Sequence, residues 1–173
     1  RLADAELAGL DLSCWRLAAN GAEPVNPDTL ARFAAAFARY GLDARILTPV
    51  YGLAECAVGL CVPPPGRGVV VDRVPRASVR LGAQVEPAAD TAGSTDTTDA
   101  ADAASPGHAA GTANAADTAD TLRLVSCGPA LPGHALRIVD ADGKPLPERH
   151  IGAVEFRGPS ATAGYYRNPG ATA

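Results

Sequence analysis

The hydrophobic pattern of the first third of the chain predicts one amphipathic helix. From residue 27 onward, apolar side chains recur at the spacing i, i+3, i+4, i+7 and i+8, at Leu30, Phe33, Ala34, Phe37 and Ala38. This spacing places them on one helix face, which we expect to be buried on a sheet. Asn26 is suited to cap the N-terminus, Pro27 to fill the first position and Gly41 to end the helix.

Two apolar runs flank this helix and predict strands, at residues 14–19 and 46–51. The short joints between strand, helix and strand predict a right-handed parallel crossover. Each predicted strand leads into a glycine turn, NGAEP at 20–24 and YGLAE at the end of segment 48–55. Because ligands of open α/β sheets bind outside the carboxyl ends of the strands, the two turns together predict a nucleotide-sized pocket.

The last third of the chain is rich in predicted strands. They lie at 122–126, 135–140 and 153–157, and a short apolar run at 69–71 predicts one more before them. Asp142-Gly143 is a hairpin signal between two of these runs. The predicted fold class is therefore α/β, with a parallel strand-helix-strand unit followed by a β-rich subdomain.

A low-complexity segment at 87–121 separates the two parts. It consists mainly of Ala, Asp, Thr, Ser and Gly, with no aromatic or large aliphatic residue, so it cannot bury enough surface to offset its ordering entropy. We expect a disordered insertion, and a tolerated surface loop more than a partner site. Its six aspartates account for the net charge of −4, since the other residues carry 13 acids and 15 bases. No clustered basic face indicates nucleic-acid binding.

The cysteines and histidines give little sign of a metal site. Cys14, Cys56, Cys61 and Cys127 have no CxxC spacing, and we expect them to be small buried thiols in a reducing, cytoplasmic compartment. The three histidines, His108, His134 and His150, are expected in solvated loops. No apolar run is long enough to span a bilayer, which predicts a soluble protein with no transmembrane segment. The chain begins at Arg1 and has no Met, so we expect it to be an internal piece of a longer protein.

Two stretches together resemble the adenylate-forming (AMP-binding) ligase superfamily, and most closely its fatty acyl-AMP ligases. The first is WRLAANGAEPVNPDTLARFAAAFARYG followed by YGLAE, and the second is VSCGPALPGHALRIVDADGKPLPERHIGAVEFRGPSATAGYY. The similarity covers residues 11–62 and 122–173, with several motifs in the expected order. It implies that the chain is a fragment of the large N-terminal domain of such a ligase.

The resemblance implies roles for the residues of both turns. Gly21, Ala22 and Glu23 would lie along the adenine, with the glycine allowing close approach. In the second turn, Tyr51 would stack on the adenine ring, and Gly52, Leu53 and Ala54 would complete the nucleotide-binding motif, while Glu55 would hold Mg²⁺. Ala54 stands where the wider superfamily commonly has Thr, and this departure matches the acyl-AMP ligase branch. Without the resemblance, the same residues predict a plain connector, a core tyrosine and a solvated glutamate.

The resemblance also implies what the chain lacks. The phosphate loop with its lysine would lie upstream, and the ribose-binding acid and catalytic lysine would lie downstream. No catalytic residue is therefore expected within these residues, and we expect the piece alone to be inert, because acyl and phosphoryl transfer need positioned cations. Residues 63–86 stand where fatty acyl-AMP ligases carry an extra element that restricts coenzyme A thioesterification.

The implied activity is that of a fatty acyl-AMP ligase, which uses ATP and Mg²⁺ to convert a fatty acid into an acyl adenylate and pyrophosphate. The acyl group would pass to an acyl carrier protein or to the carrier domain of a polyketide or peptide synthase. Two alternatives remain, a long-chain acyl-CoA synthetase and a non-catalytic remnant of such a domain. The predicted organisation is a nucleotide-binding portion at 1–62, the family-type insertion at 63–86, the low-complexity loop at 87–121 and the β-rich subdomain at 122–173.

Overall fold

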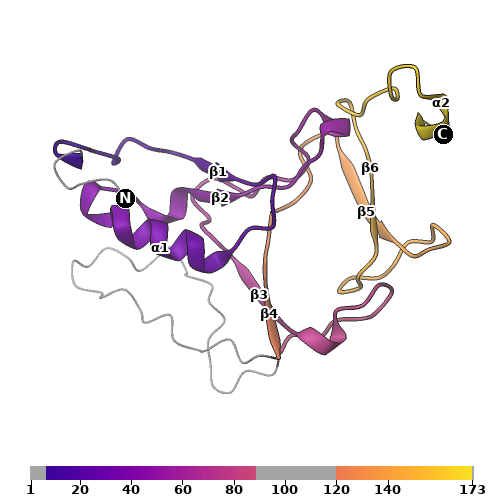
Figure 1. Ribbon diagram of the computed structural model, residues 1–173, viewed down its shortest axis with the longest axis horizontal. Helices are drawn as coiled ribbons and strands as arrows, with labels where there is room; N and C mark the ends of the chain where they lie inside the picture. Colours follow the sequence, from indigo (N-terminus) through magenta and orange to yellow (C-terminus); the bar gives the residue numbers. More distant parts are fainter. Residues whose placement is uncertain (1–6, 89–119, 173) are drawn as a thin grey trace.

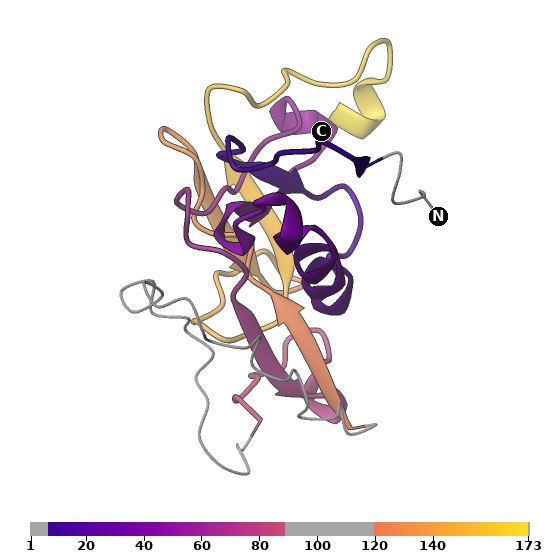
Figure 2. The ribbon, with the colours of Figure 1, turned by 90° about the vertical axis from the view of Figure 1, so that its left-hand side faces the viewer.

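The computed structural model describes residues 7–88 and 120–172. Three two-stranded sheets follow one another across the molecule, with one longer helix beside the first of them (Figure 1). In chain order the elements are β1 (Ala18–Asn20), α1 (Pro27–Phe37), β2 (Leu47–Pro49), β3 (Val71–Pro75), β4 (Thr121–Val125), β5 (Ala135–Val139), β6 (Ala153–Arg157) and α2 (Pro169–Thr172). In Figure 2, α1 lies in front of the strand pairs, and β3 and β4, in magenta and orange, extend below it.

The predicted parallel strand-helix-strand unit is confirmed. β1 pairs with β2 in parallel, with Ala18 opposite Leu47 and Asn20 opposite Pro49. Both strands are shorter than predicted, because each pairs over only three residues. The residues ahead of β1 have no strand beside them in the described structure, and the side chains of Trp15 and Leu17 are 44% and 45% exposed.

Helix α1 begins as the sequence predicts. The Asn26 side chain accepts hydrogen bonds from the backbone N–H groups of Asp28 (2.9 Å) and Thr29 (3.2 Å) and so caps the first turn. At the other end the helix tightens into a 3₁₀ turn at Ala38–Tyr40, which Gly41 ends with a left-handed φ of 82°.

The buried stripe predicted for α1 is only partly correct. Leu30 is buried, but Phe33 is 37% exposed and Ala38 is exposed. The ring of Phe33 packs on that of Phe37, with 4.7 Å between their centroids. A pair of three-residue strands is too narrow to cover a stripe three turns long, so part of the apolar face of α1 stays in contact with solvent.

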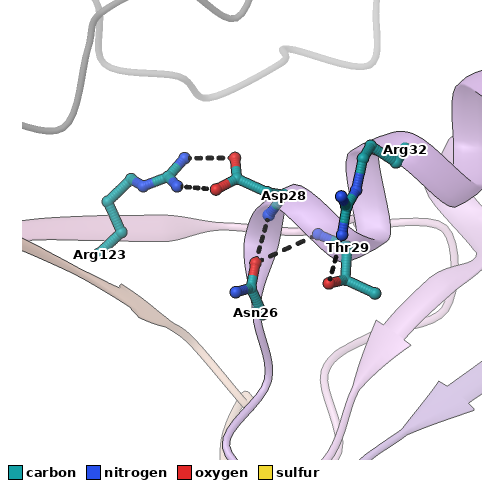
Figure 3. A network of polar contacts seen from close by, with 5 residues as sticks. All are labelled: Asn26, Asp28, Thr29, Arg32 and Arg123. Carbon is teal, nitrogen blue, oxygen red and sulfur yellow. Dashed lines mark hydrogen bonds and ion pairs between the residues drawn. The ribbon is translucent and has the colours of Figure 1, made fainter.

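An ion pair joins α1 to the middle of the molecule (Figure 3). The guanidinium of Arg123 on β4 bonds both carboxylate oxygens of Asp28, and this hydrogen bonding lowers the pKa of Asp28 below its ordinary value. Asp28 also adds negative charge at the helix N-terminus, where it is favourable. The start of α1 is therefore fixed both by its own cap and by a residue from the second half of the chain.

Strands β3 and β4 form an antiparallel pair in which Val71 lies opposite Val125 and Pro75 opposite Thr121. The strand predicted at 69–71 is present but shifted, because it starts at Val71, where pairing with β4 begins, and runs to Pro75. The predicted disordered insertion falls mostly on residues 89–119, which lie outside the described residues. The residue before this segment bonds to β3, and the residue after it bonds to the position that follows β3. The N–H of Ala88 donates to Arg73 O (2.7 Å), and the N–H of Arg76 donates to Asp120 O (2.6 Å).

Strands β5 and β6 pair antiparallel over five residues each, with Ala135 opposite Arg157. The Asp142-Gly143 turn is also present. Across this turn the N–H of Asp140 donates to Lys144 O (3.0 Å), and Val139 forms an antiparallel β-bridge with Pro145. The hairpin is therefore one bridge long, and the main partner of β5 is β6.

Two hydrophobic clusters form the described core. The first consists of Leu12, Leu42 and Ile46 beneath β1, and the second of Cys56, Leu60 and Cys61, with Phe156 of β6 packed against it. The prediction of buried cysteines holds for Cys56 and Cys61 and only in part for Cys127, which is half-buried. It was wrong for Cys14, which is exposed ahead of β1. In the part of the chain that the structure describes, no helix has the length and apolar character needed to cross a membrane.

The positions of the insertion flanks predict that its length matters little. Arg73 and Arg76 are three positions apart, roughly 10 Å along a strand, so a short Gly-Ser linker can join residues 88 and 120. We expect this replacement of residues 89–119 to leave the urea midpoint nearly unchanged, because loop-closure entropy varies slowly with length. A decrease of several kcal/mol in the free energy of unfolding would contradict this prediction.

Candidate functional site

The two glycine turns singled out by the sequence lie at the same edge of the β1–β2 pair. The N–H of Val50 donates to Asn20 O at 2.8 Å, which continues the parallel pairing past the last strand residues. A Cβ on Gly21 would lie 2.8 Å from Val50 O and 2.9 Å from Val50 Cγ2. Glycine at this position therefore lets the first turn lie directly against the second.

The first turn leads from β1 into α1. Ala22 has a left-handed φ of 71°, and both Ala22 and Glu23 are exposed. A shallow pocket of about 170 Å³ opens here, lined by Asn20, Gly21, Glu23, Pro24, Asn26, Thr29 and Leu30. Complete ligand sites usually enclose about 300–1,000 Å³, so this pocket by itself is smaller than a complete ligand site.

The second turn is a closed loop that begins and ends in a β-bridge. Tyr51 and Cys61 exchange two backbone hydrogen bonds, Tyr51 N–H to Cys61 O (3.0 Å) and Cys61 N–H to Tyr51 O (2.8 Å). The N–H of Leu131 donates to Leu60 O at 2.8 Å and so ties the end of this loop to the last third of the chain. The side chain of Tyr51 is 39% exposed at this edge, so its ring is accessible for stacking.

The chain inside this loop is tightly folded. A Cβ on Gly52 would lie 1.6 Å from Val58 O, so no side chain fits there. Ala57 and Val58 both have positive φ, 52° and 76°, a conformation that is uncommon for Ala and strained for a β-branched residue. Strained backbone of this kind persists where the surrounding structure determines it, and it is concentrated at functional sites.

Glu55 lies in the middle of a short 3₁₀ turn, Ala54–Cys56. The hydroxyl of Tyr165 donates a hydrogen bond to Glu55 Oε1, and this bond lowers the pKa of Glu55 below its ordinary value and raises that of Tyr165. The hydrogen bond therefore favours the charged form of the carboxylate. Tyr165 was not assigned a role from the sequence, although it belongs to the GYY that ends the second resembling stretch.

The chain segment before Tyr165 bonds to the same turn. The Thr162 N–H donates to Glu55 O (2.8 Å), and the Ser160 hydroxyl donates to Cys56 O (3.0 Å). His134 Nε2 lies 2.7 Å from the same Ser160 oxygen. The prediction of a merely solvated His134 was therefore wrong, because its ring is half-buried and hydrogen-bonded beside the turn. His108 lies outside the described residues.

The donor set suits a metal that arrives with a phosphorylated ligand. Among residues 7–88 and 120–172, no group of three or more His, Cys, Asp and Glu side chains could hold an ion by itself. Mg²⁺ is usually bound by one or two carboxylates together with substrate phosphates, and Glu55 supplies one ionised carboxylate next to the Tyr51 edge. The residues present therefore fit a Mg²⁺–nucleotide.

Comparisons with known proteins show the family to which the chain belongs. No protein-family model matches the sequence. A Caulobacter vibrioides protein named, provisionally, as an acyl-CoA synthetase is 31% identical over 180 residues. A medium-chain fatty acid–acyl-carrier-protein ligase of Teredinibacter turnerae is 29% identical over 170 residues, or 98% of this chain. The structure of a fatty acyl-adenylate ligase from L. pneumophila with acyl adenylate and pyrophosphate matches 99% of this chain and 25% of its own, with a TM-score of 0.76 and 26% identity.

These relatives are much longer than the chain. It covers 26% of the Caulobacter protein and 22% of the Teredinibacter ligase, so it spans about a quarter of their length.

The tight loop predicts very different effects for two glycine substitutions. Gly52→Ala should lower the melting temperature and the affinity for nucleotide, because its Cβ would overlap Val58 O. Gly59→Ala, in the same loop, should be nearly neutral, since its Cβ would meet only Leu131 Cδ1 at an ordinary 3.5 Å. Thermal melts and nucleotide titration of both variants test this, and equal behaviour would contradict the described loop.

Proposed function

Since the chain belongs to the adenylate-forming ligase superfamily, we propose that it forms the adenine-binding edge of a fatty acyl-AMP ligase. One observation carries the proposal. The turns at 21–23 and 51–55 leave adjacent parallel strands at the same level and lie against each other through Gly21 and Val50. The carboxyl ends of parallel strands are where open α/β sheets bind nucleotides.

In this proposal the first turn lines one side of the adenine and Tyr51 stacks on its ring. Gly21 and Glu23 line the shallow pocket, and Ala22 lies exposed between them. Gly52 and Leu53 set the path of the loop, and Ala54 exposes a small side chain ahead of Glu55. Stacking of a base on an aromatic ring contributes about 1–3 kcal/mol.

Glu55 is proposed to hold Mg²⁺ together with the phosphates of ATP. A bound Mg²⁺ would neutralise charge on the phosphates and orient them. Within this chain, Glu55 contributes a carboxylate that accepts a hydrogen bond from the Tyr165 hydroxyl, and its turn Ala54–Cys56 belongs to the same loop as Tyr51.

The proposed reaction is attack of a fatty acid carboxylate on the α-phosphate of ATP. A bond forms between a carboxylate oxygen and the α-phosphorus, and the bond from that phosphorus to pyrophosphate breaks. The cationic groups that this step needs belong to the rest of the longer protein, so we propose that the present residues bind and orient the nucleotide and leave the transfer to the others. We place the reaction in the cytoplasm, because Cys56 and Cys61 are buried free thiols.

The acceptor is proposed to be a carrier protein. Ala54 removes the hydroxyl found in the wider superfamily, and the Teredinibacter relative is named as an acyl-carrier-protein ligase. Residues 63–86, the proposed family-type insertion, contain β3 and reach the last third of the chain, where Gln84 bridges His150. The name of the Caulobacter relative favours the second candidate, an acyl-CoA synthetase.

The stacking role of Tyr51 predicts a graded loss of ATP affinity. In the full-length protein, Tyr51→Ala should weaken ATP binding by about 1–3 kcal/mol, while Tyr51→Phe keeps the ring and should bind nearly as well. Titration with a non-hydrolysable ATP analogue measures both. Equal affinities for Tyr51→Ala and the unchanged protein would contradict the assignment.

The product mixture decides among the candidate functions. Given ATP, Mg²⁺, coenzyme A and a medium- or long-chain fatty acid, the full-length protein should accumulate acyl adenylate and should transfer the acyl group when a phosphopantetheinylated carrier protein is added. Mass spectrometry of the products measures this. Rapid, stoichiometric acyl-CoA formation would favour the acyl-CoA synthetase, and absence of both adenylate and pyrophosphate would indicate a non-catalytic domain.

A further inference from the structure

The turn that carries Glu55 is held by a segment from the far end of the chain. Three hydrogen bonds join them, from the Thr162 N–H to Glu55 O, from the Ser160 hydroxyl to Cys56 O and from the Tyr165 hydroxyl to Glu55 Oε1. The last of these spans 110 positions of sequence. Figure 1 shows this C-terminal segment, in yellow, close to the turn after β2.

The three bonds divide into two kinds. Two of them end on backbone carbonyls and fix the path of the turn. The third reaches the side chain itself and, together with the N–H of Glu55's own backbone, favours one direction of the Glu55 carboxylate. A glutamate side chain in contact with solvent otherwise has several rotamers open to it, and binding has to overcome that freedom.

We propose that Tyr165 is a positioning residue, which orients the Glu55 carboxylate toward a divalent cation bound with the nucleotide. This inference rests on the proposed role of Glu55. An ionised carboxylate has two oxygens and about four acceptor sites, so one bond from a hydroxyl at Oε1 leaves capacity for a cation. Phenolic O–H to carboxylate bonds are charge-assisted and stronger than neutral ones.

The position of Tyr165 is itself fixed by its neighbours. Its N–H donates to Thr172 Oγ1 (3.0 Å), and its carbonyl accepts from the Asn168 N–H (3.2 Å). A Cβ on Gly164, just before it, would lie 2.2 Å from Thr172 Cγ2, so the chain passes close to α2 there. The hydroxyl therefore reaches Glu55 from a backbone that is held in place.

The next residue provides a matched control. Tyr166 is 85% exposed, compared with 49% for Tyr165, and the guanidinium of Arg167 lies 5.1 Å from the centre of its ring. Tyr165→Phe and Tyr166→Phe each remove one hydroxyl from adjacent positions. Only the first of these hydroxyls is bonded to Glu55.

The test measures cation affinity in the full-length protein, with Mn²⁺ as the probe in the presence of a non-hydrolysable ATP analogue, by electron paramagnetic resonance. We expect Tyr165→Phe to weaken Mn²⁺ binding about three- to tenfold, as the loss of one hydrogen bond implies, and Tyr166→Phe to leave it unchanged. Analogue affinity without metal should be the same in all variants. Equal Mn²⁺ affinity in Tyr165→Phe and Tyr166→Phe would overturn the proposal.

A double-mutant cycle separates this inference from the proposed function. If Tyr165 acts through Glu55, Tyr165→Phe should have no further effect in a Glu55→Gln background. An equal effect in both backgrounds would overturn the positioning role. If Glu55→Gln itself leaves Mn²⁺ affinity unchanged, the proposed role of Glu55 is wrong.

Hydrogen exchange then checks the backbone. The Thr162 amide should keep its protection in Tyr165→Phe, because its bond to Glu55 O does not use the hydroxyl. Loss of that protection would mean that the Tyr165 hydroxyl stabilises the backbone of the segment and does not act on the Glu55 carboxylate. This result would also overturn the proposal.

Discussion

The parallel pairing of β1 with β2 is the constraint on which the candidate site depends. It is only three residues long, yet it sets Asn20 level with Pro49, so both chains leave the strands at the same height. The hydrogen bond from Val50 to Asn20 and the bare backbone of Gly21 then bring the two turns into contact. Without this register, the turn at 21–23 and the loop at 51–61 would be two unrelated surface loops.

Long-range contacts complete what the strand pair begins. The loop that carries Tyr51 and Glu55 is closed by its own β-bridge, supported from below by Leu131 and packed against Phe156 through the second core cluster. On the other side, Arg123 anchors the start of α1 through Asp28. The edge is thus built on the first third of the chain and stabilised by the last third, so the two parts do not fold as independent units at this site.

The sequence predicted the local features well and the long-range ones poorly, for physical reasons. The cap at Asn26, the helix end at Gly41 and the turn at 142–143 depend on neighbouring residues, and all three are present. The short strands and the exposed Phe33 depend on how much partner surface is available, which periodicity does not encode. The bond between Tyr165 and Glu55 joins residues 110 positions apart, and no local pattern marks it. The resemblance to a known family identified the two turns in the sequence. Their contact through Gly21 became visible only in the structure.

The placement of the low-complexity segment has a consequence for how this protein could vary. Its flanks bond to Arg73 of β3 and to Arg76, the residue directly after that strand. Exposed sites where the chain leaves and re-enters a fold at neighbouring points are those at which whole domains can be inserted without disturbing the host. The β3–β4 junction is therefore a natural attachment point for an additional folded module, such as a fluorescent reporter.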